Sequence, residues 1–270
     1  MIYKAVYKIV ISDDYKRTKH PKSGLVRKWF NEGRSREWME KEVINLTINR
    51  IEQMGNNIFQ AVEDTGVQID GVEYFLTDCE NSVRKKEVKT YKANRKPNRW
   101  VSLVRKELLR MGFASTHDKW EADDLIKDRC VELGVDNYII CSPDKDLKQI
   151  PGIHFSYYQK PVKKNPDGSY PTDQYGHRIV SPYEGLSIVT EKEANRFFWK
   201  QMLMGDSGDN IKGVPRVGEK KSEIMLNTCS DLAEVEQMVL DAYVQAYGEE
   251  GQDQFNKHKL LIGLGVNHRP

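Results

Sequence analysis

The apolar positions along the chain form two alternating patterns, which predict strands followed by helices. Short runs rich in β-branched and aromatic residues are typical of strands. These runs cover residues 2–11, 71–78, 138–141 and 152–158. Apolar residues at helical spacing lie between them and predict helices. The predicted helices cover residues 23–33, 34–65, 100–113 and 119–134. This alternation favours an α/β fold with a mostly parallel central sheet flanked by helices on both faces.

Local signals mark where several of these elements begin and end. Gly33 and Gly134 follow predicted helices and favour their termination. Thr190 and Glu193 have the spacing of a capping box at the start of another helix. The segment 160–185 is rich in Pro, Gly and Tyr, and its "PDG" predicts a turn in a hairpin insertion. We therefore expect a core over residues 1–190 and a helical subdomain over residues 191–270.

Composition excludes several classes of protein. The chain has 270 residues, of which 39% are hydrophobic and 30% are charged, as in globular proteins. No apolar run approaches the length of a membrane span and no secretory signal precedes the first strand, so we expect a cytosolic monomer without membrane contact. The four cysteines are far apart and form no CxxC motif, which argues against a zinc site or a disulfide framework.

Positive charge is concentrated in one segment. Residues 84–110 contain eleven lysines and arginines but only two glutamates, although the net charge of the chain is +2. Such a basic strip suggests a polyanionic partner. A solvated lysine-rich surface is the alternative, and the aromatic residues Tyr91 and Trp100 within the strip favour the polyanion.

Acidic residues gather in four groups, two of them directly after predicted strands. The groups are Asp78; Glu121, Asp123 and Asp124; Asp144 and Asp146; and Asp206 and Asp209. In an open α/β sheet, sites form beyond the carboxyl ends of the strands. So many carboxylates in one place would repel one another unless cations bind them, and oxygen-only ligands favour Mg²⁺ or Mn²⁺. Two such cations can promote phosphodiester cleavage. Surface decoration or helix capping is the alternative for any single acid.

These segments also carry a family resemblance. "FLTD", "YKANRK", "EADDLI", "SPDKDLKQIP" and "LMGDSGDNIKGVPRVGEKK" resemble the 5′-nuclease family of phage 5′–3′ exonucleases, flap endonucleases and polymerase-linked 5′ nuclease domains. The resemblance covers about residues 71–226. It implies a PIN-like nuclease core, a helical arch over about residues 84–110, and a C-terminal helix–turn–helix or helix–hairpin–helix subdomain that binds DNA.

The resemblance assigns roles residue by residue. It implies that the four acidic groups hold two metal ions, with Asp78, Glu121, Asp123 and Asp124 around one. Lys92 and Arg95 match basic catalytic residues at the base of the arch, with phosphate positioning as the alternative for Lys92. The implied DNA contacts are Arg84, Lys85, Lys89, Gly213, Gly218, Lys220 and Lys221. Backbone carbonyls in the turn would bind K⁺, at Leu203, Met204, Lys212, Val214 and Val217.

The implied activity is hydrolysis of DNA phosphodiesters as a 5′–3′ exonuclease or flap endonuclease. RNA in RNA/DNA hybrids is a further candidate substrate. The expected partners are 5′ flaps, nicks and duplex ends, together with replication proteins, in the cytoplasm of the host cell if the chain is of phage origin. The alternative is a structure-specific DNA-binding protein that keeps the fold but has impaired or lost catalysis.

The N-terminus departs from the family pattern. The family begins with an apolar strand that ends in a metal-binding aspartate. Asp13 either supplies that carboxylate or lies at the tip of a hairpin with Asp14. In the second case, we expect the chain to be an incomplete version of a longer product.

Overall fold

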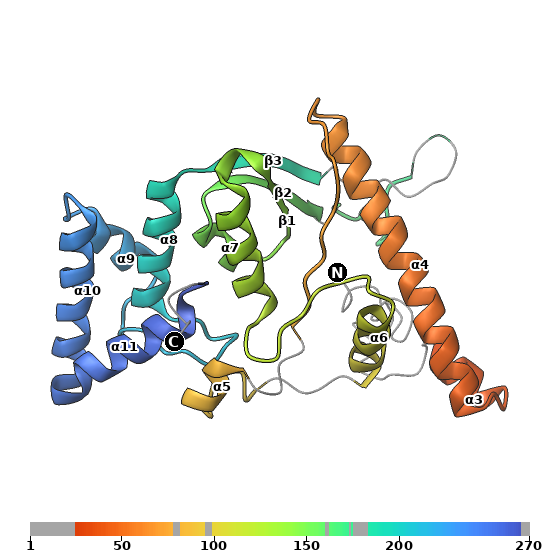
Figure 1. Ribbon diagram of the computed structural model, residues 1–270, viewed down its shortest axis with the longest axis horizontal. Helices are drawn as coiled ribbons and strands as arrows, with labels where there is room; N and C mark the ends of the chain where they lie inside the picture. The colour runs from red at the N-terminus through yellow and green to blue at the C-terminus, as the bar shows by residue number, and fades with distance from the viewer. Residues whose placement is uncertain are drawn as a thin grey trace. The chain divides into compact units, whose positions relative to one another are not determined.

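The computed structural model describes residues 25–77, 82–94, 99–159, 162–172, 174 and 183–265 (Figure 1). Two compact units are present. The first comprises residues 1–83 and 93–122, and the second comprises residues 84–92 and 123–270. The expected boundary near residue 190 falls inside the second unit, and it stays a prediction. Among the described residues, none of the helices is both long enough and apolar enough to cross a membrane.

The first unit is built on helices. Its helices are α3 (Leu25–Asn31), α4 (Arg36–Glu63) and α6 (Arg99–Arg110). The Ser35 hydroxyl accepts a hydrogen bond from the Trp38 amide, which caps the start of α4. Apolar side chains at helical spacing on α4, including Val43 and Ile51, pack against Val104 and Leu108 of α6. These helices confirm the predictions from periodicity.

The strand predicted over residues 71–78 is much shorter in the structure. Phe75 forms a single parallel bridge with Ser115, in which the Leu76 amide donates to Ser115 O at 2.9 Å. Residues 71–77 otherwise have no strand partner among the described residues, so the predicted strand is reduced to this bridge. Asp78 and Asp13 lie outside the described residues.

The second unit contains a three-stranded mixed sheet in the order β1-β2-β3. Its strands are β1 (Ile139–Cys141), β2 (Gly152–Gln159) and β3 (Tyr183–Val189). β1 and β2 are parallel, with Ile139 opposite Ile153, whereas β2 and β3 are antiparallel. The predicted "PDG" turn is present, since the Gly168 amide donates to Asn165 O at 2.9 Å. The α/β class is confirmed.

The second unit also contains helices and short 3-10 segments, which supply most of its core. They are α5 (Val83–Glu87, entering from the first unit), α7 (Ala122–Leu133), η1 (Val135–Asn137), η2 (Lys145–Gln149), α8 (Glu191–Met204), α9 (Glu219–Leu226), α10 (Leu232–Tyr247), η3 (Gly248–Glu250) and α11 (Gly251–Ile262). Cys130 of α7 packs with Ile140 of β1, and Figure 1 shows α7 beside the strands. The predicted capping box of Thr190 and Glu193 is confirmed at the start of α8.

The beginning of the basic strip packs into this core. Val88 and Tyr91 are 5% and 4% exposed, and they belong to the same apolar cluster as Met202 and Tyr243. Lys85 and Lys89, between and beside them, are exposed. The first part of the predicted arch is therefore fixed to the second unit by two buried side chains.

Candidate functional site

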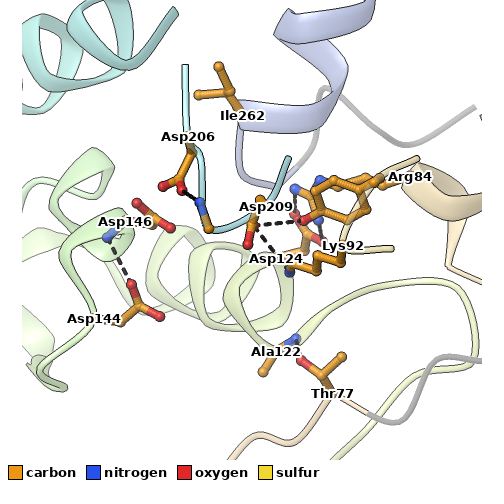
Figure 2. Close-up of polar contacts among 12 residues, drawn as sticks. Thr77, Arg84, Lys92, Ala122, Asp124, Asp144, Asp146, Asp206, Asp209 and Ile262 are labelled. Atoms are coloured by element: carbon orange, nitrogen blue, oxygen red, sulfur yellow. Dashed lines mark hydrogen bonds and ion pairs between the residues drawn. The ribbon is translucent and has the colours of Figure 1, made fainter. Parts of the chain in front are cut away.

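Arg84 and Asp124 form a buried ion pair in the second unit (Figure 2). The guanidinium Nη1 and Nη2 donate to the two carboxylate oxygens of Asp124 at 2.6 and 2.7 Å. Both side chains are almost fully buried, at 4% and 1% exposure. The expected DNA contact by Arg84 is therefore replaced by an internal bidentate pair, because the side chain points into the protein. Lys85 remains exposed and available to a polyanion.

The loop between α8 and α9 places Asp206 and Asp209. Asp206 and Ile211 exchange two backbone hydrogen bonds, of 2.9 and 2.8 Å, which close the loop into a tight turn. Gly205 and Gly213 approach so closely that a Cβ on Gly213 would lie 2.3 Å from the Gly205 amide nitrogen. Both glycines also have positive φ, of 72° and 62°, where other residues are strained. The backbone of the turn thus requires glycine at both positions.

Lys92 and Asp209 connect the basic strip to this acidic loop. The Lys92 amide donates to Asp209 O at 3.1 Å, and its Nζ lies 3.5 Å from Asp209 Oδ2. The Tyr91 hydroxyl donates to the same carboxylate oxygen at 3.4 Å, while the Asn210 side chain donates to Thr90 O at 2.9 Å. These contacts hold the "YK" of the strip against the acids that the sequence assigns to a metal. Arg95 lies outside the described residues.

The third acidic group follows β1 and contains a lysine between its two acids. The Asp144 carboxylate accepts a hydrogen bond from the Asp146 amide at 3.1 Å and so caps η2 (Figure 2). Lys145 Nζ lies 2.8 Å from Asp206 Oδ2. The structure therefore joins the groups after β1 and after α8, which the sequence separates by about sixty residues.

Electrostatics at these acids follow from burial and from their neighbours. Burial, and then the charge of Asp144, raise the pKa of Asp146 above its ordinary value. Burial alone would also raise the pKa of Asp206. The hydrogen bond and charge of Lys145, together with hydrogen bonds from the Gly208 and Asp209 backbone, outweigh that effect, so the pKa of Asp206 lies below its ordinary value. A cation beside Asp146 would therefore favour the ionised form of this carboxyl.

The acids at the start of α7 stand next to the segment that leads to Asp78. Thr77 Oγ1 accepts a hydrogen bond from the Ala122 amide at 2.9 Å, which brings residue 77 beside the start of α7. Glu121 is 2% exposed and Asp123 is half-buried. Asp78 lies outside the described residues, so its closeness to these acids stays a prediction.

The carboxylates suit a hard divalent cation by chemistry, since all of their donors are oxygen. Within the described parts of the chain, no three His, Cys, Asp or Glu residues are arranged to hold a metal ion. Instead, Asp124, Asp206 and Asp209 each pair with a basic side chain. Sequence reasoning missed these three internal partners. Only Lys145 had a signal, because it lies between two acids in "DKD".

The "GVPRVG" turn packs one side into the core and exposes the other. Val214 and Val217 are buried, and the Val214 amide donates to Leu203 O at 2.8 Å. Tyr247 donates to Gly213 O. Gly218 precedes α9 without a side-chain cap, and no atom lies within 4 Å of where its Cβ would be. The exposed side includes Lys212, Lys220 and Lys221. The K⁺ and DNA contacts assigned to this turn stay predictions.

Comparison with known proteins gives relatives of the expected kind. The chain is 30% identical over 234 residues to a DNA polymerase I of Caldicellulosiruptor bescii, covering 82% of this chain and 26% of that protein. It is 31% identical over 119 residues to a 5′-3′ exonuclease of Buchnera aphidicola, covering 43% of this chain and 34% of the relative. No family model matches the chain.

Solved structures of T5 proteins also resemble the chain. One is the T5 D15 protein co-crystallized with metal ions, at 14% identity and a TM-score of 0.43, covering 81% of this chain and 90% of the other. Another is the T5 5′-exonuclease with bound zinc, at 18% identity and a TM-score of 0.43, covering 78% of this chain and 90% of the other.

The sequence relatives confirm the resemblance that the motifs predicted: the chain is related to the 5′-nuclease family. It spans about a quarter of the polymerase and about a third of the exonuclease that it matches.

Proposed function

We propose that the chain is a metal-dependent 5′–3′ exonuclease and structure-specific flap endonuclease that hydrolyses DNA phosphodiesters. The observation that carries the proposal is the double link between Lys92 and Asp209, because it holds the basic strip against the acidic loop. A positive side chain beside clustered carboxylates suits a phosphate that is contacted by both the protein and its cations. The two curated relatives, an exonuclease and a DNA polymerase I, support the same reading.

Each group in the second unit has a role in this proposal. Asp144, Asp146, Asp206 and Asp209 would hold Mg²⁺ or Mn²⁺ through carboxylate oxygens. Two such cations, when bound, supply an activated water and stabilise the leaving oxygen. Lys145 and Lys92 must then leave Asp206 and Asp209, with which they pair in the structure. Lys145 is 62% exposed, so its ion pair with Asp206 is screened by water and exchanges readily. Lys92, released from Asp209, can contact a phosphate oxygen.

The substrate and surroundings follow from the same family resemblance. We propose 5′ flaps, nicks and duplex ends as substrates, with RNA in RNA/DNA hybrids as a further one. The exposed Lys85, Lys89, Lys220 and Lys221 would contact backbone phosphates without reading bases. Carbonyls of the "GVPRVG" turn would bind K⁺. A cytoplasmic monomer that works beside replication proteins fits these roles.

A 5′-labelled flap substrate tests the proposal directly. The wild-type chain should cleave it with Mg²⁺ or Mn²⁺ and not with a chelator. Asp144→Ala and Asp206→Ala should abolish cleavage and leave flap binding within a few-fold, whereas Asp167→Ala should cleave normally because Asp167 lies in the exposed hairpin turn. Normal turnover by either of the first two variants, or no cleavage of flaps, nicks and duplex ends by the wild type, would refute the proposal.

A second candidate is a DNA-structure-binding protein with impaired or lost catalysis. The observation that favours it is the pairing of Asp124, Asp206 and Asp209 with basic side chains. Tight, specific binding of flaps over linear duplex without cation-dependent cleavage would establish this candidate.

A further inference from the structure

The last described residues, 260–265, contact the buried pair of Arg84 and Asp124 through their backbone. We call these residues the C-terminal segment. Arg84, which pairs with Asp124, also donates from Nη2 to Gly263 O at 2.6 Å and from Nε to Leu260 O at 3.4 Å. The Gly265 amide donates to Asp124 Oδ1 at 3.1 Å. Asp124 is therefore held by Arg84, as Figure 2 shows, and also by the C-terminal segment.

A second chain of hydrogen bonds runs from the same segment to another acid. Ile262 O accepts from Gln149 Nε2 at 3.0 Å, and the same amide donates to Gln201 Oε1 at 2.7 Å. Gln201 Nε2 then donates to Asp146 Oδ1 at 2.6 Å. Gln201 is 8% exposed and Gln149 is half-buried, so the Gln201 end of this chain of amides is shielded from water. Asp124 of α7 and Asp146 of η2 are thus both connected to the C-terminal segment.

The C-terminal segment is packed as well as hydrogen-bonded. Ile262, Gly263 and Gly265 are buried, and Leu264 packs against Ile140 and Leu147. Gly265 has a φ of 80°, and a Cβ there would lie 2.5 Å from Lys127 Cγ. Buried, mutually satisfied polar groups of this kind rigidify the groups that they hold. Substitution of Gly265 would therefore displace the segment without removing any acid or its partners.

We propose that the C-terminal segment is a positioning element that fixes Asp124 and Asp146, with Arg84 and Gln149 as its connectors. In this arrangement, the Asp124 carboxylate is directed to Arg84 and Gly265. Its role is therefore to fix the position of α7. Asp146 is held in place by the amide chain, and its part in cation binding rests on the proposed function. Partners that orient metal-binding groups in this way commonly change cation affinity when they are lost.

The first test compares Gly265→Ala with Gly248→Ala. Gly248 also has positive φ, of 60°, but nothing lies within 4 Å of its Cβ position, so it controls for backbone strain. Amide hydrogen exchange of the metal-free chains is measured over residues 122–127 and 145–149. Gly265→Ala should speed exchange in both ranges by about tenfold or more relative to the control, because both ranges lose their support. Equal exchange in the two variants would overturn the proposal.

The second test uses Mn²⁺ alone, titrated by calorimetry. Gln149→Met should weaken Mn²⁺ binding by about 10-fold to 100-fold, whereas Gln237→Met, which removes an exposed amide that contacts Asp241, should bind as the wild type does. Unchanged binding by Gln149→Met would overturn the role of the amide chain. If the wild type binds no Mn²⁺, the proposed function fails while the exchange experiment still decides the positioning role. If Gly265→Ala does not fold, Arg84→Lys serves instead, with Lys86→Arg as its exposed control.

Discussion

Replacing Arg84 by methionine should destabilise the chain strongly. The change leaves the Asp124 carboxylate at 1% exposure without its cationic partner, and it removes the donors to Gly263 O and Leu260 O. Breaking a buried ion pair from one side costs about 3–5 kcal/mol, because the remaining charge is neither hydrated nor paired. We therefore expect the free energy of unfolding to fall by about 3–5 kcal/mol.

The penalty should come from the buried carboxylate that has lost its ion-pair partner rather than from the loss of attraction. The double variant Arg84→Met/Asp124→Leu removes both charges and replaces them with apolar groups of similar size. Such replacements are often neutral or stabilising, so the double variant should recover most of the loss. Lys86→Met on the same helix is the control, since Lys86 is exposed and should leave stability close to that of the wild type.

Equilibrium unfolding in urea, followed by circular dichroism, measures all four proteins. A free energy of unfolding for Arg84→Met within about 1 kcal/mol of the wild-type value would refute the reasoning, because loss of the partner of a buried carboxylate should cost more than that. A double variant no more stable than the single one would show that packing of the arginine stem, rather than charge, dominates.

The other predictions concern single features of the second unit. Lys92→Ala should lower turnover more than it lowers affinity for flap DNA, measured by single-turnover kinetics and titration; equal effects would reduce Lys92 to a positioning contact. Gly213→Ala should lower the free energy of unfolding by about 1–3 kcal/mol in urea titrations, because φ there is 62° and the Cβ would meet the Gly205 amide. Burial lowers the pKa of His258 from 6.5 to about 4. The unfolded chain therefore binds the proton first, and stability should fall by up to about 3 kcal/mol as the pH drops from 6.5 to 4. A His258→Gln variant should lose this part of the pH dependence, and an unchanged profile would contradict the assignment.

Local sequence signals predicted the helices well. The capping box at Thr190 has both reciprocal hydrogen bonds, and α4 buries Val43, Ile51, Ile58 and Val62 of the apolar residues at helical spacing. These features depend on residues within a few positions of one another, which is the range over which sequence patterns are informative. The strand predicted at residues 71–78 failed to extend beyond one bridge because its existence depends on partners far along the chain.

The candidate site was predictable in its residue types but not in its contacts. The order of the acidic groups and the "YKANR" motif indicated which side chains belong together. Nothing in the sequence indicated that the Arg84 side chain points inward to Asp124. Arg84 belongs to the same basic strip as Lys85 and Lys86, and those two side chains are exposed. Arg84 lies in the five-residue helix α5, and its direction depends on how the following Val88 and Tyr91 pack into the core of the second unit. Such packing is a tertiary contact. The hydrogen-bond chain from Ile262 through Gln149 and Gln201 to Asp146 is likewise formed by three elements that meet only in the fold.

The pairing of acids with the chain's own basic residues has a consequence for how cations and DNA would act together. Carboxylates gathered in one unit repel one another, and Lys92 and Lys145 reduce that repulsion at Asp209 and Asp206. A cation that binds the same carboxylates replaces this role and frees the lysines, which are then available to phosphate. A phosphate that attracts Lys92 away from Asp209 correspondingly leaves that carboxylate in need of a cation. Because coupling between two binding events is reciprocal, each ligand then strengthens the binding of the other by the same factor. These ion pairs favour the candidate function without catalysis. In an active nuclease, however, the same ion pairs would make cation binding depend on the presence of DNA.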